Sequence, residues 1–169
     1  MKQRGFTFIE LLLYIALISI LATVSVFFIT NVTSSRIKVE VQEEVTYSAR
    51  FLSERISREI RGASAITSLA ANDLCLAMVD SARNPTRIYI SAGRARIGWG
   101  GGGACSATTS NYDLTSSDMV VNSLNFVNLS TGTSKNVDYT VNISGKTLTN
   151  RQEWVFNTNV KGSGEIRTN

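Results

Sequence analysis

The residue types that perform most protein chemistry are sparse in this chain of 169 residues, which contains no histidine. Serine or cysteine nucleophiles activated by histidine are therefore excluded. The stretch GWGGGGAC, residues 98–105, predicts a surface loop, because no Gly-Lys-Ser/Thr sequence follows it as in a phosphate-binding loop. Asp113 and Asp118 flank a Ser/Thr-rich loop and could ligate calcium, but calcium loops supply more ligands than two carboxylates. We expect no enzyme, no cofactor and no metal.

One carboxylate near the N-terminus has an unusual setting, because Glu10 is the only charged residue in residues 6–30. An apolar run of this length predicts a membrane-spanning helix, which needs roughly 20 residues at about 1.5 Å rise each. A charge at the bilayer centre costs about 2.5–3.5 kcal/mol on insertion scales. Glu10 therefore calls for a cationic partner.

Three interpretations of the segment treat Glu10 differently. A secretory signal peptide has a basic start, as Lys2 and Arg4 would supply, but its apolar core is shorter than this one. A plain single-pass anchor fits the hydropathy and gives Glu10 no role. If residues 1–5 are removed, the new α-amine of Phe6 lies about one helical turn from Glu10 and can pair with it. Pairing with the amine of a neighbouring copy would fix the stagger between packed helices.

The stretch RGFTFIELLLYIALISILA, residues 4–22, resembles the N-terminal signal of type IV pilins and the related pseudopilins. The resemblance implies cleavage after Gly5 by a prepilin peptidase, methylation of Phe6, and an assembly salt bridge made by Glu10. It covers roughly the first thirty residues and not the remainder of the chain. Many major pilins carry a proline within this apolar segment, and its absence here favours a pseudopilin or minor pilin.

Beyond Thr30 the sequence turns polar but keeps a helical period, so we predict one helix from Phe6 to about Gly62. Two pairs at i,i+4 spacing, Glu54 with Arg58 and Arg55 with Glu59, would support it on an exposed face. Apolar residues form one stripe along the second half of this helix. The stripe contains Val41, Val45, Leu52, Ile56, Ile60 and Ala63.

The rest of the chain predicts a β-rich head, with strands at residues 74–79, 86–92, 119–129, 136–143 and 152–160. SGKT, residues 144–147, predicts a tight hairpin turn, and the polar tail after residue 160 predicts a loose end. The fold class is α+β, a long N-terminal helix packed on a C-terminal antiparallel sheet. The expected parts are a leader (1–5), a transmembrane and polymerisation helix (6–30), an amphipathic continuation (31–63) and the head (64–169).

The head contains both cysteines of the chain, Cys75 and Cys105. If the head is exported to an oxidising compartment, a disulfide between them is expected; otherwise both remain thiols. Four arginines gather near Tyr89 and Trp99 and offer either a nucleic-acid patch or a solvated sheet face. They are Arg83, Arg87, Arg94 and Arg96.

The resemblance implies a structural filament subunit that waits in the cytoplasmic membrane with its head in the periplasm or outside the cell. Its implied partners are other pilin-like subunits, the prepilin peptidase, an assembly platform and the secretin machinery. The sequence around residues 51–66 resembles the J-type minor pseudopilins of type II secretion and related minor pilins. An adhesive or DNA-uptake pilin, whose head binds a ligand or nucleic acid, remains the alternative, as does an unrelated membrane-anchored binding module.

Overall fold

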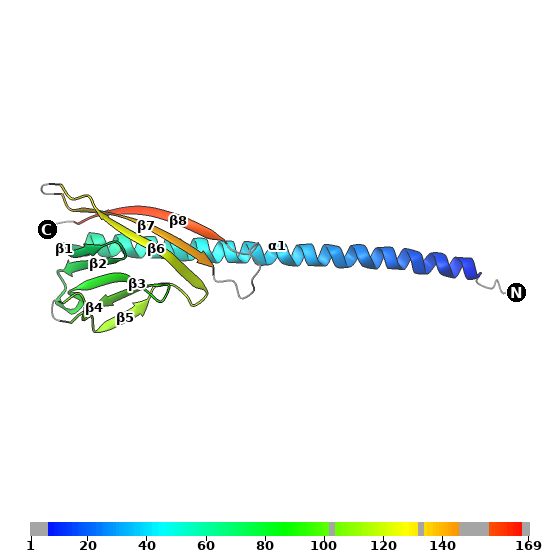
Figure 1. Cartoon of the computed structure of the whole chain (residues 1–169), viewed down its shortest axis with the longest axis horizontal. Helices are drawn as coiled ribbons and strands as arrows, with labels where there is room; N and C mark the ends of the chain where they lie inside the picture. Colours follow the sequence, from blue (N-terminus) through cyan, green and yellow to red (C-terminus); the bar gives the residue numbers. More distant parts are fainter. Residues whose placement is uncertain (1–6, 102–103, 132–133, 146–155, 167–169) are drawn as a thin grey trace. The chain divides into compact units, whose positions relative to one another are not determined.

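The computed structural model describes residues 7–101, 104–131, 134–145 and 156–166 (Figure 1). The chain divides into two compact units, Met1–Glu40 and Val41–Asn169. One helix, α1, runs from Phe8 to Gly62 and belongs to both. No proline interrupts it, because the single proline of the sequence is Pro85. The expected end of the helix at Gly62 is confirmed.

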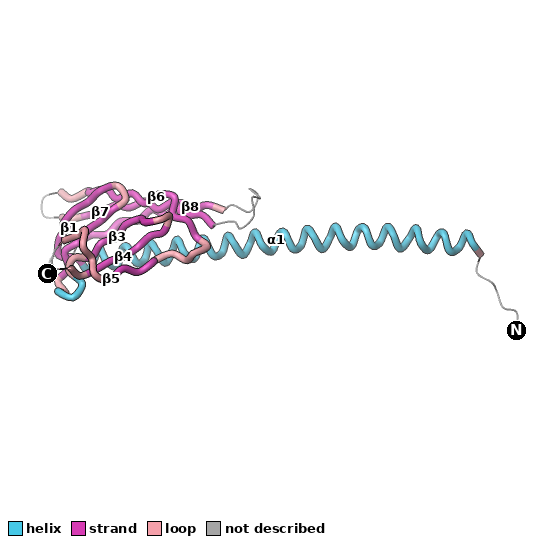
Figure 2. Tube along the Cα trace, turned by 60° about the horizontal axis from the view of Figure 1, so that its bottom comes forward, coloured by secondary structure: helices cyan, strands magenta, loops and turns pink. Residues whose placement is uncertain are grey.

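Gly62 is followed directly by strand β1, and the described strands form two antiparallel sheets (Figure 2). The first sheet has the order β1-β2-β3-β4-β5, and the second has the order β6-β7-β8. The first consists of β1 (Ala63–Ala70), β2 (Asp73–Met78), β3 (Thr86–Ser91), β4 (Arg94–Trp99) and β5 (Ser110–Asp113). The second consists of β6 (Met119–Asn128), β7 (Asn136–Gly145) and β8 (Asn157–Glu165). A short 3-10 helix, η1 (Ser81–Arg83), lies between β2 and β3.

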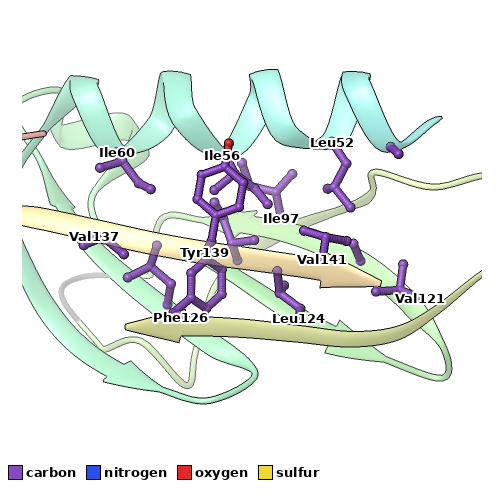
Figure 3. Packing of buried hydrophobic residues seen from close by; sticks show 14 of the residues in the cluster. Leu52, Ile56, Ile60, Ile97, Val121, Leu124, Phe126, Val137, Tyr139 and Val141 are labelled. Carbon is purple, nitrogen blue, oxygen red and sulfur yellow. The ribbon is translucent and has the colours of Figure 1, made fainter. Parts of the chain in front are cut away.

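The core lies between the second half of α1 and the two sheets (Figure 3). The predicted helical stripe is confirmed, since Val45, Leu52, Ile56 and Ile60 are fully buried. β7 alternates as predicted, with every second side chain directed into the core. These β7 residues are Val137, Tyr139, Val141 and Ile143. The α+β fold with an antiparallel head is therefore as expected.

Tyr139 places a polar group in this apolar core: its ring is buried, and its hydroxyl reaches α1 (Figure 3). The hydroxyl donates to the Ser53 carbonyl at 2.9 Å and also lies 2.8 and 2.7 Å from the Ser53 and Ser57 hydroxyls. Gly162 of β8 leaves room for this ring, since a Cβ there would overlap the Tyr139 phenol. The aromatic side chain thus joins helix and sheet without an unsatisfied polar atom at its hydroxyl.

The end of the chain differs from the sequence-based expectation. The tight turn expected at residues 144–147 lies partly outside the described residues; of its four residues, Ser144 and Gly145 belong to β7, and Ser144 pairs with Asn157. Residues 146–155, which include the start of the strand expected at 152–160, lie outside the described residues. The expected loose tail is wrong as far as Glu165, because β8 pairs with β7 along that length. These polar and glycine residues show no strand pattern in the sequence, and backbone hydrogen bonds to β7 hold them in a strand.

Strands β2, β3, β6 and β7 were expected close to their observed bounds, whereas β1, β4 and β5 were not. β4 carries Arg94 and Arg96 on one face and follows a turn in which Ala92 and Gly93 have positive φ. β5 is a short polar strand, Ser110–Asp113, between the strands expected at residues 86–92 and 119–129. β4 pairs with β3 across this turn and β5 pairs with β4, and the composition of the two segments does not reveal these pairings.

Candidate functional site

The N-terminal candidate site centres on Glu10, in the first turn of α1. The Thr7 carbonyl accepts hydrogen bonds from the backbone N–H groups of Glu10 and Leu11 at 3.1 and 3.2 Å. A carboxylate is favoured here by the positive end of the helix dipole. Glu10 is exposed and forms no ion pair with any described residue, so its carboxylate can accept an outside amine. Gly5 and Phe6, the predicted cleavage and methylation residues, lie outside the described residues.

The helix that carries Glu10 is, among the described residues, the one helix long and apolar enough to cross a membrane. Three hydroxyl groups in the apolar part of this helix donate to carbonyl groups of the helix itself. Ser19 donates to the Ala16 carbonyl, Thr23 to the Ser19 carbonyl and Ser25 to the Leu21 carbonyl, each at 2.8 Å. These bonds reduce the cost of placing hydroxyl groups in lipid, where no water replaces them. Among the described residues, no side chain forms an ion pair with the Glu10 carboxylate.

The cysteine pair forms the expected disulfide, which joins Cys75 of β2 to Cys105 after β4, with 6.0 Å between their Cα atoms. Cys75 is fully buried. The bridge spans 30 positions and ties the segment between β4 and β5 to β2. Closing a loop of this length in the unfolded chain contributes about 3–4 kcal/mol on chain-entropy estimates. A disulfide is consistent with a head outside the cytosol.

The four arginines of the candidate patch each lie against a carboxylate. Arg94 and Arg96 donate to the two oxygens of Asp113 at 2.8 and 2.6 Å. Arg87 Nε donates to Asp73 at 2.9 Å, and its guanidinium lies over the Tyr89 ring. The fourth, Arg83, pairs with a carboxylate of α1 described below. Much of the positive charge is thus neutralised within the chain, and a nucleic-acid role for these side chains stays a prediction.

These contacts shift the pKa values of Asp113 and Arg87. Hydrogen bonds from Arg94 and then Arg96 hold the pKa of Asp113 below its usual value of 3.8. The pairing therefore stabilises the fold fully above pH 3.8, and this contribution is lost as the pH falls through the lowered pKa. The hydrogen bond to Asp73 raises the pKa of Arg87 above its usual value. Asp113 and Arg87 are consequently charged at neutral pH.

Glu59 of α1 is a functional candidate that the sequence did not identify as buried. Its predicted pairing with Arg55 is confirmed at 3.1 Å, but the carboxylate is 1% exposed and also accepts from Arg83 of η1 at 2.8 Å. Arg83 lies over the Trp99 ring, 5.1 Å from its centroid. The network therefore fastens the end of α1 to η1 and β4. In the sequence, the burial of Glu59 is indicated only by its position beside the apolar stripe.

The predicted companion pair, Glu54 with Arg58, does not form among the described residues. Both side chains are exposed, so water competes with an attraction that is worth little at a helix surface.

Comparison with known proteins places the N-terminal site in a class. Residues 1–26 match the prokaryotic N-terminal methylation motif. The chain therefore carries a type IV pilin-like prepilin signal, which points to a structural protein rather than an enzyme. No curated protein and no solved structure matches the chain. The apolar helix and the signal together fit a single-pass membrane protein that is later assembled into a filament.

Proposed function

We propose that the chain is a structural subunit of a type IV pilus-like filament or a type II secretion pseudopilus, in the role of a minor pilin or pseudopilin. A prepilin peptidase removes residues 1–5 and methylates Phe6. The mature chain is then drawn from the cytoplasmic membrane into the filament by an assembly platform and works with the secretin machinery. The motif at residues 1–26, continuous with a helix that carries Glu10 in its first turn, is the observation that supports this most.

The role of Glu10 follows from its setting. An exposed carboxylate on an apolar helix, without an ion-pair partner among the described residues, is costly in lipid until a cation reaches it. The methylated amine of Phe6 in a neighbouring subunit is such a cation. Pairing between subunits gives each helix a fixed axial offset, because the two charges lie at different heights along their chains. Glu10 thereby sets the register of assembly.

The alternative role, an adhesive or DNA-uptake pilin, would place ligand binding in the head. The four arginines proposed for that role are engaged by Glu59, Asp73 and Asp113, so no observation favours it over a filament contact.

Replacement of Glu10 tests the proposal. The Glu10→Leu and Glu10→Gln variants should insert into the membrane and fold normally, because the head is built from residues after Val41. Both should enter filaments at least tenfold less than the parent chain, since neither can pair with an amine. Quantitative immunoblotting of sheared filaments against the membrane fraction measures this ratio. Glu54→Gln, which removes an exposed carboxylate from the same helix, is the control and should assemble normally. Parental incorporation of Glu10→Leu would contradict the proposed pairing.

A further inference from the structure

Strand β8 forms an open edge of the second sheet, because no described strand pairs with it on the side away from β7 (Figure 1). At one end of its pairing with β7, the Gly145 N–H donates to the Phe156 carbonyl at 3.2 Å. At the other end, the Ile166 N–H donates to the Lys135 carbonyl at 2.8 Å. Bonded and non-bonded pairs alternate in an antiparallel ladder, so the odd-numbered residues of β8 direct their N–H and C=O groups away from β7. These residues are Asn157, Asn159, Lys161, Ser163 and Glu165.

The open edge lacks most of the features that protect edge strands. β8 is nine residues long, contains no proline and pairs with β7 without a bulge. Its central residue, Lys161, is exposed on the solvent face of the sheet. By contrast, the outer edge of β6 is engaged, since the Phe126 N–H donates to the Ala71 carbonyl at 3.2 Å. The row of backbone donors and acceptors on β8 matches one kind of ligand, which is another extended strand.

A hollow of about 370 Å³ lies on the side of α1 along which β8 passes. A Cβ at Gly162 would overlap the Tyr139 phenol, whose hydroxyl lies 2.8 and 2.7 Å from the Ser53 and Ser57 hydroxyls. A Cβ at Gly164 would lie 2.7 Å from Ile60. At about 100° per residue, Ser57 lies between buried Ile60 and exposed Arg58 around the helix, so the hollow begins where the sheet ends. Its lining consists of Ser53, Glu54, Ser57, Arg58 and Arg61.

The charges around this edge favour an acidic ligand. The hollow contains two guanidinium groups and one carboxylate, that of Glu54, which leaves a net charge of +1. Neither Arg58 nor Arg61 forms an ion pair with a described residue. Lys161 adds a positive charge on the other face of the sheet, at the middle of β8, whereas Glu165 lies at its end. A strand added to β8 directs alternate side chains to these two faces, so carboxylates near its middle are favoured on both.

We propose that an extended strand of a different protein, acidic near its middle, adds to the open edge of β8 and covers the hollow on α1. Backbone hydrogen bonds supply the affinity, and the positive charges select the partner. A second copy of the chain is disfavoured, because antiparallel pairing of two β8 strands along their full length places Lys161 opposite Lys161. The contact goes beyond the proposed function and requires neither processing of residues 1–5 nor filament assembly.

Peptide binding to the full-length chain in detergent tests the proposal. The probe is a peptide as long as β8, made of alternating threonine and valine with two adjacent glutamates at its centre. Amide hydrogen exchange, measured by NMR, should slow about tenfold at the outward-directed amides of β8 when the peptide binds, and change little at the amides bonded to β7. The same peptide with its two central amides N-methylated, which blocks both of its edges, should bind about tenfold more weakly. A peptide with lysines in place of the glutamates should bind about fivefold more weakly.

Two pairs of variants separate the backbone contribution from the charge contribution. Ser163→Pro removes one outward N–H and no bond to β7, and should weaken binding of the glutamate peptide about tenfold. Ser163→Ala loses the same side chain, keeps the N–H and should bind like the parent chain. Arg61→Glu should weaken binding about fivefold. Lys38→Glu makes the same charge change at an exposed helix position outside the unit Val41–Asn169 and should have no effect.

Absence of binding, equal binding of the N-methylated peptide, or unchanged binding to Arg61→Glu would overturn the proposal. If Ser163→Pro unfolds, the N-methylated peptide decides the backbone contribution alone. Exchange at the outward amides that slows with rising chain concentration, without peptide, would assign the edge to a second copy and overturn the proposed partner. None of these measurements depends on processing or filaments, so their failure leaves the proposed function standing, and a chain that retains residues 1–5 would overturn the proposed function alone.

Discussion

At the scale of single residues, two glutamates of α1 show two ways to place a carboxylate in apolar surroundings. Glu59 is buried and is satisfied inside the chain by Arg55 and Arg83. Glu10 lies on an apolar surface and has no ion pair among the described residues, and the proposed function assigns it a partner in a neighbouring subunit. The i,i+4 spacing predicted the first of these contacts to Glu59. It could not predict Arg83, which folding brings from 24 positions away.

The Glu59 network allows a stability prediction. Glu59→Gln keeps the shape of the side chain but leaves two arginines without their counter-charge, so the free energy of unfolding should fall by about 1–3 kcal/mol. Glu54→Gln, at an exposed site on the same helix, should change it by less than about 0.5 kcal/mol. Urea unfolding of the full chain in detergent, followed by circular dichroism, measures both. Equal effects of the two substitutions would show that the buried ion pairs do not stabilise the head.

At the scale of elements, the sequence pattern predicted the helix and strand that bury an apolar face. It did not predict the strand that is held mainly by pairing with its neighbour. The stripe of α1 and the alternation of β7 are visible in sequence because one face of each is apolar. β8 has no such pattern: its residues Asn157–Glu165 include two glycines, two asparagines and a lysine. Glycine is depleted in strands, so the sequence predicted a strand that ends at residue 160 and a loose tail beyond it. Pairing with β7 and close packing on α1 hold this segment as a strand.

The close packing of β8 predicts an unusual effect of adding one methyl group. A Cβ at Gly162 would overlap the Tyr139 ring, and one at Gly164 would lie 2.7 Å from Ile60. Gly162→Ala should therefore lower the free energy of unfolding by about 1–3 kcal/mol, although alanine normally suits a strand better than glycine. Ser163→Ala, on the exposed side of the same strand, should be nearly neutral. Thermal unfolding of the full chain in detergent compares them. A Gly162→Ala chain as stable as the parent would contradict the packing.

At the scale of the whole molecule, information about function is concentrated in residues 1–26, whereas the head matches no curated protein and no solved structure. The prepilin signal is readable in sequence because cleavage, methylation and Glu10 pairing each need a particular residue at a fixed position. The sequence of the head contains no comparable motif from which its partners could be predicted. The folded structure is needed to show which of its charged side chains, such as Arg83, form an ion pair with another described residue and which, such as Arg58, do not.

The central claim is that the chain is a processed, filament-forming pilin-like subunit, and the intact mass of the mature protein tests it most directly. Mass spectrometry of the chain isolated from membranes and from sheared filaments should show loss of residues 1–5 and one added methyl group on the Phe6 amine. A bulky residue at Gly5, as in Gly5→Leu, should block cleavage and keep the chain in the membrane. Assembled filaments in which the chain retains Met1 and carries no added methyl group would contradict the account.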